Sequence, residues 1–392
     1  MSSNKAWPMR RGITGHFETT TAGGEAVRGF VPDPLPPAPP LELTPARQRL
    51  LERALLACGR LDGVSALLPD PELFLYAYVR REAVLSSQIE GTQSSLSDLL
   101  LFEMEEAPGV PVDDVVEVSN YVAAMEHGMA RLADKESGLP LSNRLLREIH
   151  GKLLACGRGA DKEPGEFRGS QNWIGGARPG NAQYVPPPPH LVAECMAGLE
   201  RFLHDPDIPA LIKAALAHVQ FETIHPFLGG NGRTGRLLIA LILHQEGVLR
   251  QPLLYLSLYL KQHRSEYYRL LDTVRHDGDW EAWLDFVLEG VLQTAEAAVD
   301  TAHRLLALFA DDERRIRESR AAGSAQRAFA VLRRRPLVTI DGVTKGAAMT
   351  FPTASRAIDM LMDLQIVREL TGKRRNRVFA YDGYLAILNE GV

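Results

Sequence analysis

The chain has 392 residues, of which 45% are hydrophobic and 24% are charged, and its formal net charge is −5. This length suits two or three globular domains, and the mild negative charge argues against a protein that coats nucleic acid along its whole length. The three cysteines have neither the number nor the spacing of a disulfide framework or a metal site, which suits a reducing compartment. The longest apolar run is about seven residues, far short of the ~20 that a membrane span needs, and no signal-peptide pattern opens the chain. We therefore expect a soluble, cytoplasmic protein with no membrane partner.

Residue patterns divide the chain into five segments. The first is rich in glycine, threonine and proline, and we expect it to form an extended arm or to be disordered. Helical periodicity begins near Thr44, where Thr-Pro supplies an N-cap followed by proline in the first turn. The expected segments are an extended Pro-rich arm at 1–40, an N-terminal helical region at 41–108, a core at 109–300, a helical connector at 301–323 and a final domain at 324–392.

One stretch inside the helical part lacks the helical period. Residues 164–190 contain several glycines and a run of four prolines. Two short apolar stretches, Asn172–Ile174 and Gln183–Val185, flank a turn rich in glycine and proline. This pattern predicts a β-hairpin.

The final segment differs in charge from the rest of the chain. Residues 324–392 carry eleven Lys and Arg against six Asp and Glu. Their patterns predict helices at 325–334, 342–348 and 354–364 and short extended stretches at 337–340, 366–370 and 378–381. Two strands around a basic turn after three helices are the layout of a winged helix-turn-helix. The basic turn and Arg356 favour phosphate contacts with DNA, and a protein-interaction or dimerisation module is the alternative.

The most informative segment is His225-Pro-Phe-Leu-Gly-Gly-Asn-Gly-Arg-Thr-Gly-Arg236, which joins two apolar helical stretches. Its glycines let the backbone adopt positive φ and approach an anion, and N–H groups at a helix N-terminus attract phosphate oxygens. Arg233 and Arg236 are three residues apart, so they share one helix face and can bind further oxygens. The segment therefore predicts a cradle for nucleotide phosphates, with His225 beside it as a proton acceptor.

This segment resembles the signature HPFx[D/E]GNGRxxR of the Fic family, whose members typically transfer AMP from ATP to a protein hydroxyl group. The resemblance implies a mainly α fold, with a Fic-type helical bundle, a β-hairpin flap and the C-terminal winged helix-turn-helix. It also implies that His225 takes the proton from a Ser, Thr or Tyr hydroxyl and that Phe227 packs inward. ATP and Mg²⁺ are the implied cofactors. The implied nucleotide-binding residues are Gly230, Asn231, Gly232, Arg233, Thr234, Gly235 and Arg236, with Arg233 on the β-phosphate and Arg236 on the γ-phosphate.

One position departs from the family pattern. Gly229 stands where the family has Asp or Glu to hold Mg²⁺, and a glycine has no side-chain oxygen to offer. The chain then has no protein ligand for the metal, which ATP phosphates alone would hold. Metal and electrostatic interactions usually contribute several kcal/mol to catalysis. We therefore expect impaired catalysis and retained nucleotide binding.

A second motif, Ser86-Ser-Gln-Ile-Glu-Gly91, resembles the inhibitory pattern [S/T]xxxE[G/N] of the family. Ser86 and Glu90 are four residues apart, so both can point at one partner from a single helix face. In the family this glutamate pairs with the second arginine of the signature, here Arg236, and occupies the γ-phosphate site. The resemblance implies an enzyme that its own N-terminal region inhibits. Taken alone, Glu90 would be an ordinary solvated helix residue.

Further nucleotide contacts follow from the same resemblance. The flap would lie with Ile174, Gly175 and Gly176 over the nucleotide and would align the target backbone by β-augmentation. Tyr267 and Tyr268 resemble tyrosines that border the adenine pocket, and a role as core aromatics is an equal alternative.

Two functions from different classes remain open. The first is a protein adenylyltransferase that uses ATP, releases pyrophosphate and is inhibited by Glu90. The second is a catalytically silent nucleotide-binding regulator that acts through a DNA-binding winged helix. Transfer of a phosphoryl, uridylyl or phosphocholine group would use the same fold. The expected partner is a protein with a hydroxyl side chain. The sequence also leaves open self-modification, DNA binding by residues 324–392 and the formation of a homodimer.

Overall fold

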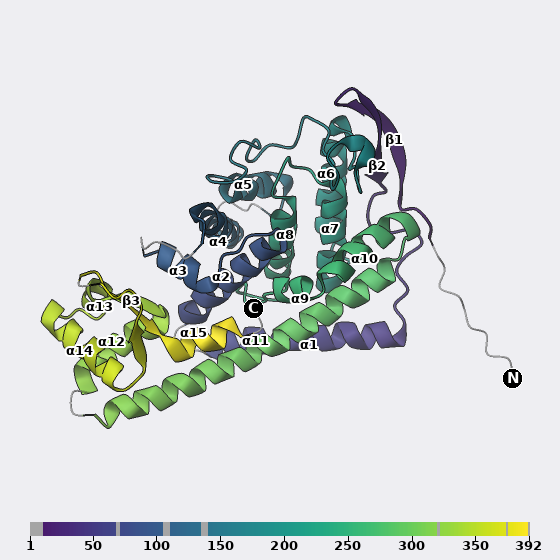
Figure 1. The fold of residues 1–392 in the computed structure, drawn as a ribbon. Helices are drawn as coiled ribbons and strands as arrows, with labels where there is room; N and C mark the ends of the chain where they lie inside the picture. Colours follow the sequence, from purple (N-terminus) through teal and green to yellow (C-terminus); the bar gives the residue numbers. More distant parts are fainter. Residues whose placement is uncertain are drawn as a thin grey trace.

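The computed structural model describes residues 11–67, 71–104, 110–134, 140–319, 322–373 and 375–390. The remaining positions of the five expected segments lie outside the described residues. The chain is built mainly from helices, as predicted, with a bundle in the middle, a hairpin at one edge and a small mixed cluster at the other end (Figure 1). None of the helices that the structure describes combines the length and the apolar character needed to cross a membrane.

Helices α7 (Ala210–Ile224) and α8 (Asn231–Gln245) form the centre of the bundle. Every residue of α7 from Leu211 to Ile224 is buried, including the polar residues of its second half. The other helices of the bundle surround this pair (Figure 1). They are α2 (Pro71–Ile89), α3 (Leu96–Phe102), α4 (Val112–Ala133), α5 (Asn143–Leu153), α6 (Pro189–Leu203), α9 (Ser257–Gln262) and α10 (Arg264–Asp277).

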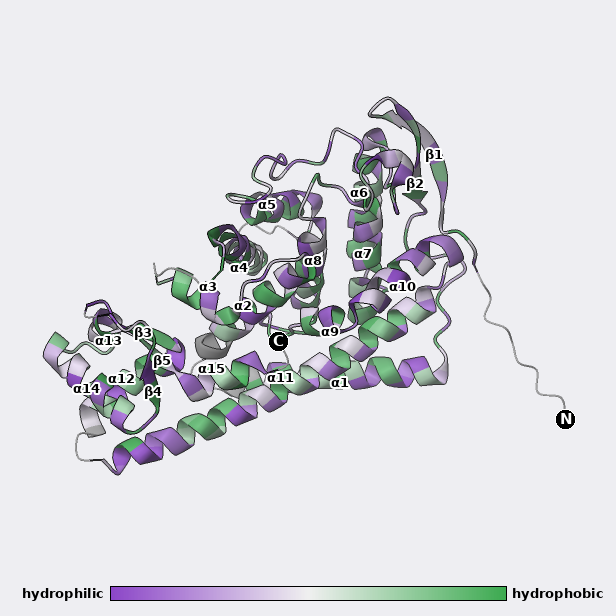
Figure 2. Cartoon of the chain, viewed as in Figure 1, coloured by the Kyte–Doolittle hydropathy of each residue, from purple (hydrophilic) through white to green (hydrophobic). Residues whose placement is uncertain are grey.

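A single helix of 38 residues, α11 (Trp280–Arg317), runs along one side of the bundle. Figure 2 shows apolar and polar residues mixed along its length, and α1 (Pro45–Leu67) packs beside it. The buried Trp283 donates from Nε1 to the Ala215 carbonyl at 2.8 Å, which ties α11 to α7. The expected boundary between core and connector, after residue 300, falls within this helix.

The N-terminal segment contains a β-hairpin where we expected an extended arm or disorder. Strands β1 (Gly15–Ala22) and β2 (Glu25–Pro32) pair antiparallel through a Gly-Gly turn. The hairpin escaped prediction because β1 has no buried residue and lacks an apolar alternation. The anchor of the hairpin is Phe30, which is 1% exposed and donates its N–H to the Val185 carbonyl at 2.9 Å.

The predicted flap hairpin is only partly formed. Its two stretches meet in one isolated β-bridge, Ile174–Tyr184, and the turn between them contains the short 3-10 helix η1 (Pro179–Asn181). The prolines that follow lack N–H groups and cannot extend a ladder. The flap is therefore a loop that lies against β2 and has no regular strands of its own.

A second cluster of elements follows α11 at the end of the molecule away from the hairpin (Figure 1). Its strands form an antiparallel sheet in the order β3–β5–β4. The order of helices and strands is the one predicted for this segment, with one additional helix at the end. The elements are α12 (Ala322–Arg334), β3 (Leu337–Thr339), α13 (Ile340–Gly346), α14 (Phe351–Asp363), β4 (Val367–Glu369), β5 (Val378–Tyr381) and α15 (Asp382–Asn389).

Candidate functional site

The turn between α7 and α8 is closed by its own side chains. His225 ends α7 with φ 50° and ψ 61°, a left-handed conformation that is uncommon outside glycine, and Gly230 begins α8 with φ 72°. Asn231 accepts a hydrogen bond from the Phe227 N–H at 2.9 Å and donates one to the Phe227 carbonyl at 2.8 Å. The first N–H groups of α8, which have no partner within a helix, are thereby presented to an anion.

His150 of α5 supports the same turn. Its ring stacks on Phe227 with centroids 3.7 Å apart and planes at 4°. Nδ1 accepts the Gly165 N–H at 2.9 Å, so Nε2 is the nitrogen that donates to the Gly229 carbonyl, also at 2.9 Å. Burial lowers the pKa of His150 to about 4, which keeps the ring neutral. This role of His150 was not predicted, because its partners are distant in the chain and no local motif marks it.

Replacing His150 with phenylalanine should preserve the stack and remove both hydrogen bonds. We expect the free energy of unfolding at neutral pH to fall by about 2 kcal/mol, because two buried main-chain groups lose their partners. Since the folded-state pKa of His150 is depressed, this histidine contributes fully to stability above its unfolded pKa and loses that contribution as the pH falls towards 4. The variant should therefore lose less stability than the original chain between neutral and mildly acidic pH. Urea denaturation at the two pH values measures this, and equal losses would contradict the assignment.

The ring of His225 is neutral and has a nitrogen without a hydrogen bond in the described part of the chain. Its side chain is 15% exposed, and Nδ1 lies 4.0 Å from Glu222 Oε2 without a hydrogen bond among the described residues. Burial, with the nearby cations Arg168 and Arg275, lowers the pKa of His225. The imidazole is therefore neutral at physiological pH, as a general base must be.

Arg168 holds His225 in its left-handed conformation. This side chain is 2% exposed and donates from Nε to the His225 carbonyl at 2.9 Å. It also donates to the carbonyl of Ser170 at 3.2 Å and to that of Pro187 at 2.6 Å, at the two ends of the flap. One arginine thus fixes the flap and the turn between α7 and α8 to each other. Arg168 was not predicted, because none of its partners lies in a motif with it.

Arg233, the first arginine of the signature, is buried beside Glu117 of α4. Its Nη1 lies 3.0 Å from Glu117 Oε1, an ion pair without the alignment of a hydrogen bond. Arg233 is 6% exposed, and its Nε and Nη1 have no hydrogen-bond partner in the described part of the chain. Buried donors without partners are rare, and they suit a site that receives an anionic ligand. The pairing with Glu117 was not predicted.

Arg236 is bound by both predicted residues of the inhibitory motif, Ser86 in α2 and Glu90 directly after it. Its Nε donates to Ser86 Oγ at 2.8 Å, and its Nη2 donates to Glu90 Oε1 at 2.8 Å. Burial alone would raise the pKa of Glu90, but Arg236 outweighs that effect and the pKa is lowered, so the carboxylate is charged. A Cβ atom on Gly232 would lie only 2.2 Å from Glu90 Oε1. Glu90 therefore occupies the first turn of α8, where a phosphate oxygen would otherwise approach. Gly91, the last residue of this motif, follows α2 with φ 102°, which a side chain would disfavour.

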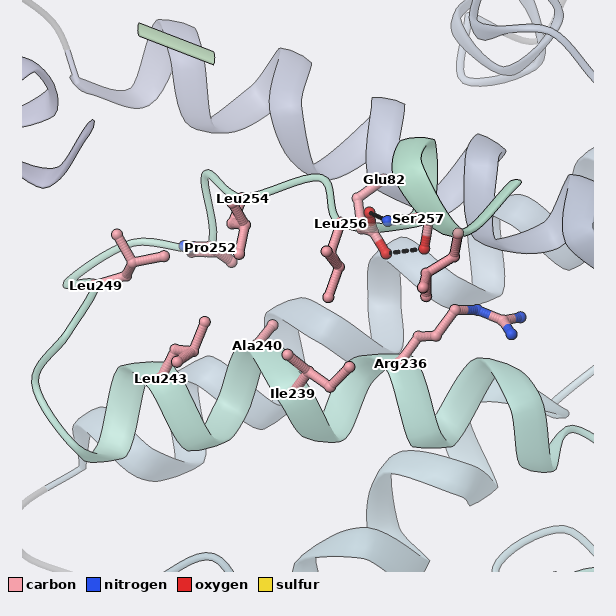
Figure 3. Close-up of a pocket in the computed structure, with 11 residues that line it drawn as sticks. Glu82, Arg236, Ile239, Ala240, Leu243, Leu249, Pro252, Leu254, Leu256 and Ser257 are labelled. Carbon is pink, nitrogen blue, oxygen red and sulfur yellow. Dashed lines mark hydrogen bonds between the residues drawn. The ribbon is translucent and has the colours of Figure 1, made fainter. Parts of the chain in front are cut away.

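On the side away from Glu90, Arg236 lines a small and mostly apolar cavity. Figure 3 shows Arg236 at one end of a small pocket, beside Glu82 and Ser257, with leucines and Ile239 along the rest. The cavity measures about 20 Å³, room for one water molecule. Burial raises the pKa of Glu82 to about 7, and Ser257 donates two hydrogen bonds to its carboxyl group. Arg236 has little freedom to move away from α2 in this direction.

Two of the expected nucleotide-binding residues of α8 do not face the cradle. Thr234 is fully buried and donates from Oγ1 to the Gly230 carbonyl at 2.9 Å. A Cβ on Gly235 would lie 2.7 Å from Glu222 Oε1, so this glycine permits close packing of α8 on α7. Neither residue faces the cradle. Gly230, Asn231 and Gly232 begin α8, where their main chain lies at the cradle.

The predicted nucleotide-binding residues of the flap and of α10 differ in how far they are buried. Gly175 and Gly176 follow the bridge residue Ile174 with φ values of 68° and 80°, which explains the two glycines. Tyr267 is buried and its hydroxyl bonds His218 Nε2 at 2.9 Å, so it belongs to the core. Tyr268 is 44% exposed and is the one of the two tyrosines that can border a ligand.

The residues present do not fit a resident Mg²⁺ ion. Gly229 offers only its carbonyl, and His150 already donates to it. The described residues contain no group of three or more His, Cys, Asp or Glu side chains arranged to hold a metal. A Cβ at Gly229 would instead meet Lys162, at 3.6 Å from its Cγ. A hard divalent cation needs several oxygen ligands, which this position lacks.

A helical bundle that presents a histidine and two arginines around one glycine turn is the Fic-type arrangement. Residues 48–130 match the family model described as Fic/DOC family N-terminal, and residues 140–243 match the Fic/DOC family model. These two segments therefore match the N-terminal and the Fic domains of the Fic/DOC family.

Curated relatives of the chain are named protein adenylyltransferase Fic. The protein from Drosophila ananassae is 30% identical over 226 residues, which cover 55% of this chain and 42% of that protein. The protein from Aedes aegypti is 32% identical over 213 residues, which cover 53% of this chain and 39% of that protein. The chain thus spans about two fifths of the length of these relatives.

Solved structures support the fold. A Fic family protein from Desulfovibrio desulfuricans G20 matches with a TM-score of 0.58 and 21% identity, over 88% of this chain and 98% of that one. A Fic domain containing signaling protein from Bacteroides thetaiotaomicron VPI-5482 matches with a TM-score of 0.51 and 20% identity, over 65% and 97% of the two chains. The predicted Fic-type bundle is confirmed.

Proposed function

We propose that this chain is a protein adenylyltransferase that moves AMP from ATP to a Ser, Thr or Tyr hydroxyl of a protein. The observation that carries the proposal is the neutral His225 beside the N-terminus of α8, with the buried donors of Arg233 next to it. The names of the curated relatives support the same activity.

In this reaction the hydroxyl proton passes to the His225 imidazole as the hydroxyl oxygen attacks the α-phosphorus. The bond between the α-phosphorus and the oxygen bridging to the β-phosphate breaks, and pyrophosphate leaves with the electron pair. Such chemistry depends on positioning and charge stabilisation. The N–H groups at the start of α8 and the guanidinium groups of Arg233 and Arg236 supply both. Arg168 is a positioning residue, because it acts through His225.

Glu90 would act as the inhibitor of this reaction. Its carboxylate lies against Gly232 and on Arg236, so it competes with phosphate oxygens for the same donors. Ser86 holds the same arginine from one helical turn earlier, through its hydroxyl and its carbonyl. Activity would require the end of α2 to move away from α8.

Intact-mass spectrometry with ATP tests the proposal on four purified forms: the original chain, Glu90→Gly, Gly229→Asp and the double variant. We expect little or no added AMP mass on the original chain and clear self-modification or target modification after Glu90→Gly. AMP that appears only when Asp occupies position 229 would mean that the fold and the inhibitory contact are as described and that the chain as it stands is a binder. The absence of AMP from all four forms would sink the proposal.

A second candidate is a nucleotide-binding regulator without catalysis. The feature that favours it is Gly229, which offers no side-chain oxygen to a metal, together with the basic character of residues 324–392. This function predicts a change in DNA affinity on adding ATP. An electrophoretic mobility assay in which saturating ATP leaves DNA affinity unchanged would reject it.

A further inference from the structure

The place where a side chain at position 229 would begin is covered by Lys162. A Cβ atom built on Gly229 would lie 3.6 Å from Lys162 Cγ and 3.8 Å from Lys162 Cβ, which are ordinary packing distances. The methylene stem of a lysine therefore lies beside the position that lacks a carboxylate. The positively charged Lys162 therefore lies next to Gly229, the position at which the family has a carboxylate.

The placement of Lys162 depends on the same histidine that holds the catalytic turn. Gly165, three residues after Lys162, donates its N–H to His150 Nδ1 at 2.9 Å, and His150 Nε2 donates to the Gly229 carbonyl. On the other side, the Lys162 N–H donates to the Gly159 carbonyl at 2.9 Å. The loop that carries Lys162 and the turn that carries Gly229 are thus fixed to one ring.

The ammonium group of Lys162 is available to a ligand. Its described ion-pair partner is the neighbouring Asp161, with Nζ 3.4 Å from Oδ2, and the two side chains are 50% and 75% exposed. Exposed pairs of this kind contribute little and break easily. Arg233 and Arg236, in contrast, are buried and paired with glutamates. From Cγ, three further bonds carry the charge of a flexible lysine roughly 4 Å, enough to reach an anion beside Gly229.

We infer that Lys162 supplies the positive charge at the nucleotide phosphates that a carboxylate-held metal would otherwise supply. Lysine binds phosphate as a point charge. During transfer, the electron pair of the broken bond goes to the departing pyrophosphate, and the Lys162 ammonium stands next to it. The inference rests on the proposed nucleotide function. It explains how Gly229 and a working phosphate site can occur together, with nucleotide binding that does not depend on a divalent metal.

Isothermal titration calorimetry with ATP in EDTA, and again with Mg²⁺, tests this inference on the full chain. All forms carry Glu90→Gly, so that the Glu90 carboxylate does not compete with phosphate. Lys162→Gln removes the charge and keeps most of the stem. Lys152→Gln is the matched control, because Lys152 is also an exposed lysine and lies one element earlier, in the last turn of α5.

In EDTA we expect the parent to bind ATP within about threefold of its affinity in Mg²⁺, and Lys162→Gln to weaken binding about tenfold or more, the size of a charged hydrogen bond. Lys152→Gln should change affinity less than about twofold. Equal ATP affinity of the parent and Lys162→Gln in EDTA would overturn the inference and leave the nucleotide function standing. Failure of every form to bind ATP, with or without Mg²⁺, would overturn both. Adding Gly229→Asp to Lys162→Gln should restore affinity only in Mg²⁺, because the site then has a carboxylate and no competing ammonium.

Discussion

Replacing His225 with alanine in the Glu90→Gly background is expected to lower the rate of AMP transfer by about 10³-fold, with ATP affinity nearly unchanged. A positioned general base contributes roughly 10²–10⁴-fold to such a step. ATP affinity should persist, because the phosphate donors come from the start of α8 and from Arg233 and Arg236. Initial rates from intact-mass spectrometry and ATP affinities from calorimetry separate the two effects.

The control for this variant is His190→Ala. His190 is an exposed histidine near the start of α6, with 63% of its side chain accessible, and it pairs with Glu18 of β1. Its replacement should leave the transfer rate within about twofold, since surface pairs contribute little. A transfer rate for His225→Ala within tenfold of the parent would mean that another group accepts the proton.

Replacing Arg168 with alanine is expected to have the largest effect on stability, a loss of about 3 kcal/mol or more in the free energy of unfolding. Its four hydrogen bonds run to main-chain carbonyls in the flap and at the end of α7. Removing a buried charged donor leaves these acceptors without partners, and each can cost about 1–3 kcal/mol. Urea denaturation measures the loss. Arg178→Ala, which removes an exposed arginine from the same flap, is the control.

A second measurement separates positioning from stability in the Arg168 variant. At a temperature at which Arg168→Ala is fully folded, we expect ATP affinity to be retained and the transfer rate to fall, because His225 loses the contact that fixes its backbone. Arg168→Lys should not restore the rate, since one ammonium cannot reach carbonyls on three sides. A folded variant with a normal transfer rate would limit Arg168 to a structural role.

The parts of the site that are continuous in sequence could be predicted, because their geometry is local. The spacing of Arg233 and Arg236 places both on one face of α8, and the spacing of Ser86 and Glu90 lets both reach one partner from the C-terminal end of α2. That Glu90 would reach Arg236 followed only from the family resemblance. No periodicity or propensity connects two helices that are distant in the chain.

The residues that hold the site from other elements could not be predicted. His150, Arg168 and Glu117 act through partners on different helices and loops, and their neighbours in sequence carry no motif. Tyr267 illustrates the opposite difficulty. The sequence around Tyr267 was equally consistent with a residue of the adenine pocket and with a core residue. The structure shows a buried side chain whose hydroxyl bonds His218.

The fold shows the same division between local and distant information. Helices with strong apolar periodicity were predicted, and Thr44 begins α1 as expected, with its hydroxyl accepting the Arg47 N–H at 3.3 Å. The hairpin β1–β2 was missed and the flap strands were overestimated, because pairing with a distant segment decides both. Phe30 donates to Val185 across more than 150 residues, and a local pattern cannot contain that information.

The unbroken helix α11 has a consequence for the proposed transfer to a protein target. At 1.5 Å per residue its 38 residues span about 57 Å, and its sequence contains no proline at which it would kink. Tyr381 fixes the C-terminal cluster to this helix through a 2.6 Å hydrogen bond to Asp312. A partner held by residues 322–390 is therefore kept at a set distance and orientation from His225. Under the proposed transfer function, its local concentration at the turn between α7 and α8 would depend on this spacing, so that geometry alone would favour one hydroxyl over chemically identical ones.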